Sequence, residues 1–212
     1  MSVLQRIFAR DDRFFRLLEQ SADEAKNGAA KLVQFVAQIE QGSVDELLGD
    51  LGQSRRKHKR LSQETTEELC KKFVTPLERE DIEALSAALY KISKNVEKIG
   101  ERLTIAPHGA NMATIVRQIS ILEQATGVLV TMVGQLRSGT RGEQIKDSYE
   151  RLQVLEGEGD RAMNDLLRDL YRGEIDARVV VFWKDIYELL EKGIDRCRDA
   201  GFVIFHVVLK NA

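Results

Sequence analysis

Apolar residues recur at helical spacing along most of the chain, and the third such stretch is the clearest. Its apolar positions advance in steps of three and four through Ile82, Leu85, Leu89, Ile92, Val96, Ile99 and Leu103. Such steps keep side chains on one face of a helix, so the stretch predicts an amphipathic α-helix. Asp81 and its acidic neighbours favour the start of this helix, and Pro107-His108-Gly109 favours its end.

Five further stretches show the same periodicity. They predict helices over about 12–40, 44–73, 112–136, 143–171 and 178–210. Ser43 and Glu46 have the spacing of a capping box, which favours a helix start there. Pro76 favours the end of that helix near Phe73, because the residue before a proline disfavours helical geometry. No stretch alternates with the period of a strand, so we expect an all-α fold.

The predicted helices read as three followed by three, which suggests an internal repeat. Asp81-Ile82 at the start of the third helix matches Asp185-Ile186 in the sixth. On this alignment the basic or neutral residues of one half take the places of acidic residues in the other: Arg55 and Lys59 match Glu156 and Asp160, and Lys91 and Asn95 match Asp195 and Asp199.

Composition restricts the function further. The 212 residues carry a net charge of −2, which favours neither nucleic acid nor an anionic membrane as a general partner. Cys70 and Cys197 form no CxxC motif and are expected to be reduced thiols inside helices. The N-terminus lacks the apolar core of a signal peptide, and no run approaches the about 18 apolar residues of a membrane span. We therefore expect a cytoplasmic protein.

Acidic residues of the fifth and sixth helices are the main candidate for chemistry. Glu156 and Asp160 are four residues apart, so they share a helix face, and Glu156 falls at the margin of the apolar stripe. A carboxylate in that position needs a hydrogen-bond partner, a cation or a metal. Together with the sixth-helix carboxylates they are candidate oxygen ligands for a metal: Glu156, Asp160, Glu188, Glu191, Asp195 and Asp199. The alternative is a solvated acidic face paired with Lys184, Lys192 and Arg198.

A basic run, Arg55-Arg56-Lys57-His58-Lys59-Arg60, interrupts the second helix. Nucleic acid, anionic lipid and phosphate are ligands for such a run, but no aromatic residue is interleaved and a solvated helix face is the simpler interpretation. A further alternative is that Arg55 and Lys59 pair with carboxylates across the bundle. His58 is expected to be a core or boundary histidine, and His206 a minor candidate ligand.

Two features remain open at this stage. Gly157 and Gly159 each cost about 1 kcal/mol within a helix, which indicates close helix packing or access for a ligand. The ending 202–209 is apolar nearly all round. It either packs between the two halves or forms a contact in a homo-oligomer.

Several segments resemble the PhoU-like family that accompanies Pit-type phosphate permeases. They are Phe73-Val-Thr-Pro-Leu-Glu-Arg-Glu-Asp-Ile82, Leu155-Glu-Gly-Glu-Gly-Asp160, the helix from Tyr187 through Cys197, and Val208-Leu-Lys-Asn211. The resemblance implies two pseudo-symmetric three-helix bundles of long antiparallel helices, over 1–105 and 106–212, forming one compact unit. It also implies a non-enzymatic accessory or regulatory role in phosphate uptake, with an inorganic phosphate permease as the partner at the inner face of the membrane.

In PhoU-like proteins, acidic motifs of both halves can hold iron or zinc. Carried over, the resemblance assigns iron, zinc or another divalent cation to the six carboxylates of the second half. The first half departs from the pattern, because Arg55 and Lys59 replace the expected acids and the third helix has Tyr90, Lys91 and Lys94. Two other classes remain as alternatives: a metal-dependent enzyme that uses the acidic cluster, and a purely structural helical scaffold.

Overall fold

The computed structural model describes residues 12–39, 44–107, 111–139 and 142–211. These residues form six long α-helices, with a short 3-10 helix before the fourth, and no strand occurs in the described ranges. The helices are α2 (Asp12–Gln38), α3 (Val44–Lys71), α4 (Arg79–Leu103), η2 (Met112–Ile115), α5 (Val116–Ser138), α6 (Gly142–Arg172) and α7 (Ala177–Lys210). The predicted all-α fold is confirmed, with each periodic stretch forming one helix.

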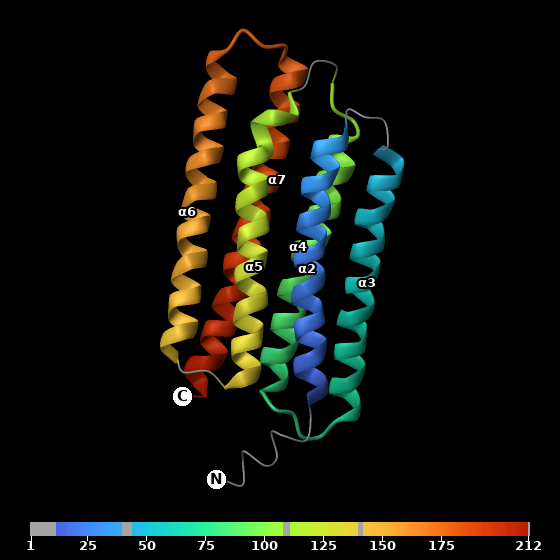
Figure 1. The fold of residues 1–212 in the computed structure, drawn as a ribbon, viewed down its shortest axis with the longest axis vertical. Helices are drawn as coiled ribbons and strands as arrows, with labels where there is room; N and C mark the ends of the chain where they lie inside the picture. The colour runs from blue at the N-terminus through green and yellow to red at the C-terminus, as the bar shows by residue number, and fades with distance from the viewer. Residues whose placement is uncertain (1–11, 40–43, 108–110, 140–141, 212) are drawn as a thin grey trace.

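The helices run up and down the long axis of the molecule (Figure 1). In this view α2 and α5 lie in front of α4 and α7, and these four helices pack against one another in the centre. Helix α3 packs on α2 and α4 at one side, and α6 packs on α5 and α7 at the other. Residues of both halves, such as Leu32, Leu89, Leu122 and Ile194, belong to one hydrophobic cluster.

Helix α5 and the turn before it form the most apolar part of this cluster. The segment Met112–Ser138 is long and apolar enough, by length and composition, to cross a membrane, which corrects the expectation from the sequence. About half of its apolar window is buried within the bundle. In the structure the segment packs against α2, α6 and α7, as the central helix of a bundle does.

Local contacts set the helix ends. Asp176 caps α7 by accepting a hydrogen bond of 2.8 Å from the backbone N–H of Arg178, and Gly139 ends α5 with a positive φ of 63°. Helix α3 ends at Lys71, two residues before the end near Phe73 that the sequence predicts. The Phe73 side chain is fully exposed. The proposed Ser43 cap lies outside the described residues.

The open question about the fifth-helix glycines is settled differently for each residue. A Cβ added at Gly159 would lie 2.8 Å from Cδ1 of Ile194, so this glycine allows α6 and α7 to approach closely. A Cβ at Gly157 would meet only the end of the Arg161 side chain at 3.6 Å. Close helix packing therefore explains Gly159 and not Gly157.

The C-terminal apolar segment turns one side inward. Ile204 and Val207 are buried, and Phe205 stacks on Tyr149 of α6 with ring centroids 5.1 Å apart. Its outer side remains exposed at Phe202 and Leu209. The segment therefore packs within the molecule along its inner side, in the hydrophobic cluster that residues of both halves share.

Candidate functional site

Four of the six predicted carboxylates come together between α6 and α7. Glu156 and Asp160 of α6 lie near Glu191 of α7. Asp195, one helical turn further along α7, is also close to Glu191. We call these four residues and Asp199 the acidic seam. The close approach at Gly159 brings the two helices together at this level. Glu188 is not part of the seam, because it is exposed and pairs with Lys184.

An arginine lies within the acidic seam. The guanidinium of Arg198 contacts Glu156 at 2.9 Å, Asp195 at 3.3 Å and Asp199 at 3.0 Å. Its side chain is about one-third exposed, at 32%. The pairing of the acidic face with Lys184 and Arg198, which the sequence left as the alternative, is present in the structure.

Glu191 has the most perturbed carboxyl group of the seam. Partial burial and the neighbouring carboxylates of Asp195, Asp160 and Glu156 raise the pKa of Glu191 to about 7. A protonated Glu191 also shares a hydrogen bond with Asp195. The seam therefore takes up or releases a proton near neutral pH.

These residues do not form a preassembled metal centre. Across the described ranges, no three Asp, Glu, His or Cys side chains are grouped so that they could hold a metal ion. Arg198 supplies the positive charge that a divalent cation would otherwise bring to Glu156, Asp195 and Asp199. The exposed His206 stacks on Phe202 instead of facing the carboxylates. The six-residue metal site stays a prediction.

The first half contains an ion pair in the corresponding place. Arg55 of α3 donates to Glu97 of α4 at 2.7 Å, which confirms that Arg55 pairs with a carboxylate across the bundle. The residues of this pair are 42 positions apart, as are those of Glu156 and Arg198. Adding 101 to Arg55 and Glu97 gives Glu156 and Arg198. The two halves therefore carry the same ion pair with its charges exchanged.

Two other contacts repeat with the same offset. His58 contacts Ser93 in the first half. The residues 101 positions later, Gly159 and Ile194, contact each other in the second half. Close contacts also join Gly100 to Leu51 and Gly201 to Leu152. The predicted alignment of the third and sixth helices is therefore wrong by three residues. Asp195 and Asp199 correspond to Lys94 and Lys98, not to Lys91 and Asn95.

A buried polar cluster lies beneath the basic run of α3, and its central residue was missed from the sequence. Glu24 of α2 is 2% exposed and accepts a hydrogen bond of 2.7 Å from Ser54. It also forms an ion pair of 2.5 Å with Lys57. Burial alone would raise the pKa of Glu24, but hydrogen bonds from Lys57, Ser54 and Asn27 outweigh this effect and lower it. The contacts stabilise the α2–α3 packing.

His58 is a core histidine, as expected. Its Nδ1 lies 2.7 Å from Oγ of Ser93, and its ring meets Tyr90 edge-on. The Nε2 atom is buried and has no partner among the described residues. Burial lowers the pKa of His58 to about 4, although Glu24 acts in the opposite direction. The histidine is therefore neutral at pH 7 and is suited to a structural role.

Three basic residues of the run, Arg56, Lys57 and Arg60, face a groove between α2 and α3. The groove has a volume of about 670 Å³, and its basic lining consists of Lys31, Arg56, Lys57 and Arg60. Acidic residues, among them Glu24, Glu46 and Asp50, line it as well. The mixture of charges matches a solvated helix face better than a dedicated anion site.

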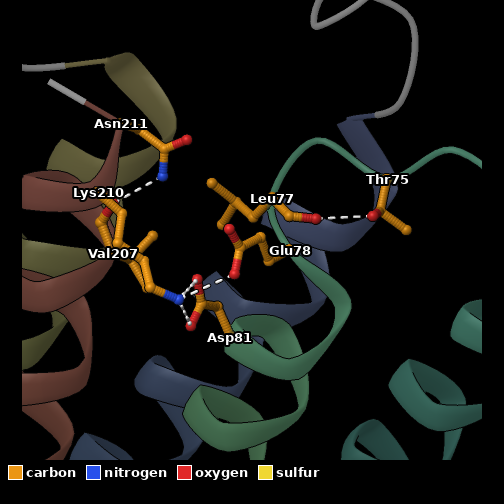
Figure 2. Close-up of polar contacts among 7 residues, drawn as sticks. All are labelled: Thr75, Leu77, Glu78, Asp81, Val207, Lys210 and Asn211. Carbon is orange, nitrogen blue, oxygen red and sulfur yellow. Dashed lines mark hydrogen bonds and ion pairs between the residues drawn. The ribbon is translucent and has the colours of Figure 1, made fainter.

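The segment 73–82, which carries much of the resemblance, is a structural connection (Figure 2). Thr75 donates a hydrogen bond of 2.6 Å to the carbonyl of Leu77, and Arg79 donates to the carbonyls of Leu69 and Lys72 at the end of α3. Lys210, near the end of α7, contacts Glu78 at 2.9 Å and Asp81 at 3.1 Å. These contacts join the last turn of α7 to the start of α4.

No protein-family model matches the chain. The chain is 26% identical to the UPF0111 protein YkaA of Bacillus subtilis (strain 168) over 204 residues, which are 96% of this chain and 98% of that protein. A crystal structure of a PhoU-like protein from Shewanella oneidensis MR-1 superposes with a TM-score of 0.80 at 19% identity, over 93% of this chain and 99% of the other.

A second crystal structure from Shewanella oneidensis MR-1, described as a putative PhoU-like phosphate regulatory protein, has the same TM-score of 0.80 at 18% identity and the same coverage. At such low identity the structural likeness establishes the fold alone. The chain therefore has the PhoU-like all-α fold over nearly its whole length.

Proposed function

We propose that this chain is a non-enzymatic regulatory protein of phosphate transport that acts by binding a membrane permease. The observation that carries the proposal is the full-length PhoU-like fold, together with a neighbour described as a putative phosphate regulatory protein. The proposal that the partner is a Pit-type inorganic phosphate permease, which this chain binds from the cytoplasmic side, rests on the sequence resemblance.

The mechanism is binding rather than catalysis. Burial raises the pKa of the Cys197 thiol above its ordinary value, which makes it a poor nucleophile at neutral pH. His58 is buried and neutral, and its Nδ1 is engaged with Ser93. Glu191, whose pKa is raised to about 7, lies among carboxylates that Arg198 already neutralises in part. In this proposal the charge of the acidic seam determines how strongly the protein docks.

Cytoplasmic loops of membrane proteins are enriched in Lys and Arg, so an acidic surface suits docking on a permease from that side. Deprotonation of Glu191 near pH 7 makes the seam more negative. Binding to a basic loop is therefore expected to strengthen as the pH rises through this value.

Phosphate uptake tests the proposal. Uptake of radiolabelled phosphate is measured in cells with and without the gene for this chain, at low and at high external phosphate, and after the gene is restored. We expect the uptake rate to change on deletion and to return on restoration. Equal uptake in all strains, together with no binding of the purified chain to the permease in proteoliposomes, would reject the proposed function.

A further inference from the structure

The offset of 101 residues reveals an inversion of charge between the two halves. Arg55 of α3 pairs with Glu97 of α4, Lys59 lies one helical turn after Arg55, and the exposed Lys94 and Lys98 lie three residues before and one residue after Glu97. We call these four basic residues the basic seam. The positions 101 residues later are acidic in every case: Glu156, Asp160, Asp195 and Asp199. The central residue is inverted as well, because Arg198 takes the place of Glu97.

Both seams lie on one face of the molecule. Helices α3, α4, α7 and α6 are neighbours in that order, and α2 and α5 cover the opposite side (Figure 1). Arg196 of α7 donates a hydrogen bond of 2.8 Å to the carbonyl of Lys91 in α4, which joins the two central helices of this face. The basic seam lies on the α3–α4 side of the junction, and the acidic seam lies on the α6–α7 side. We call this surface the charged face.

The equivalent helices α4 and α7 run in opposite directions (Figure 1). A twofold axis perpendicular to the charged face therefore relates the two halves, as the repeated contacts indicate. This axis exchanges the position of the basic seam with that of the acidic seam. The two seams of the charged face are thus related in position and opposite in charge.

A partner with a single sign of charge fits only half of this face. Nucleic acid or an anionic membrane would be attracted by the basic seam and repelled by the acidic seam, and a polybasic surface would meet the reverse. A partner that satisfies both seams needs both signs in the matching arrangement. The charged face of a second copy has this arrangement.

We propose that two copies of this chain associate through the charged face, with the basic seam of each copy against the acidic seam of the other. A twofold axis parallel to the face, perpendicular to the line between the seams, produces both pairings at once. The interface is closed, because each seam is used once and none remains for a third copy. Association in this form covers the acidic seam, so it competes with docking of that seam on a basic permease loop. The net charge of −2 for each chain opposes this association only weakly.

Charge reversal on α4 and α7 tests the proposal. Lys94→Glu with Lys98→Glu reverses the α4 part of the basic seam, and Asp195→Lys with Asp199→Lys reverses the α7 part of the acidic seam. We expect the dissociation constant of each variant to rise at least about a hundredfold, because like charges then oppose one another on α4 and α7. Mixing the two variants restores opposite charges there, so a heterodimer is expected to form more tightly than either homodimer. Sedimentation equilibrium at about 0.05 M salt, with a repeat at about 0.5 M, measures these constants.

A chain with all four substitutions provides a second measurement. Its α4 and α7 positions have exchanged charges, so opposite charges again face each other there and it is expected to form a homodimer even if one of the separate variants folds poorly. Lys26→Glu with Arg117→Glu is the matched control, since both residues are exposed on α2 and α5 and the change in net charge equals that of the lysine pair. The proposal is overturned if wild type is monomeric at low salt, if the control weakens association equally, or if folded variants fail to associate on mixing.

Discussion

Glu191→Gln isolates the energetic cost of gathering carboxylates between α6 and α7. The substitution preserves the shape of the side chain and makes it permanently neutral. In the wild-type protein the pKa of Glu191 is raised from 4.5 to about 7 by burial and by Asp195, Asp160 and Glu156. Between these two pH values the folded protein holds a proton that the unfolded chain has released. The free energy of unfolding therefore falls as pH rises through this range.

The magnitude follows from the two pKa values. At about 1.36 kcal/mol for each pH unit, the change from 4.5 to about 7 sets an upper limit of about 3 kcal/mol. Glu191 is only partly buried, so solvent screens its interactions and the expected cost is reduced to about 1–2 kcal/mol. Glu191→Gln avoids this cost, because its amide can donate to Asp195 in the manner of the protonated acid.

Urea unfolding at pH 5 and at pH 8 measures the effect. We expect the variant to be close to wild type at pH 5 and more stable by about 1–2 kcal/mol at pH 8. Glu188→Gln removes an exposed carboxylate of the same helix, and its difference from wild type is not expected to grow with pH. A difference for Glu191→Gln that is equal at both pH values, or a loss of stability at pH 8, would refute the reasoning.

Three further predictions concern other groups of the molecule. His58 resists protonation in the folded state, whereas it takes up a proton below pH 6.5 in the unfolded chain. The free energy of unfolding therefore falls by up to about 3 kcal/mol as pH falls from 6.5 towards 4, and His58→Gln should flatten this part of the plot of urea-unfolding free energy against pH. Lys210→Met removes partly exposed ion pairs, and we expect a small loss of stability with faster amide hydrogen exchange in the last turns of α7. For the predicted metal site, the zinc or iron content after dialysis should rise in Arg198→Gln and fall in Asp160→Asn and Asp195→Asn; equal content in all samples would contradict a site in the acidic seam.

The apolar pattern was sufficient to predict the helices, but it was insufficient to predict the alignment of the equivalent helices in the two halves. Shifting α7 by three residues leaves most of its apolar stripe in place, so offsets of 101 and 104 both superpose apolar positions of α4 and α7. Contacts between helices distinguish the two, as Arg55 with Glu97 and Glu156 with Arg198 do. Such contacts join residues 42 positions apart, beyond the reach of local periodicity.

The missed residues share the same cause. Glu24 gives no local signal for burial, because its partner Ser54 lies 30 positions away on α3. The end of α3 is likewise set from a distance, since Arg79 donates to the carbonyl of Leu69 in its last turn and to that of Lys72 just after it, and the chain leaves the helix before Phe73. The carboxylates of α6 and α7 were found from their spacing, but their neighbour Arg198 was identified as one of several pairing options. Its contact with three acids became evident only in the structure.

The inverted ion pairs explain how a duplicated fold can exchange the charges of its two halves without losing its packing. Arg55–Glu97 and Glu156–Arg198 have nearly equal lengths, 2.7 and 2.9 Å, so exchanging the two charges preserves the local contact. The contact energy therefore gives no reason for one half to be basic and the other acidic. What differs between the halves is the field that each seam projects from the surface, and that field acts on whatever approaches the charged face. Selection for the sign of this field requires a partner that detects it, which is why the function is sought in binding.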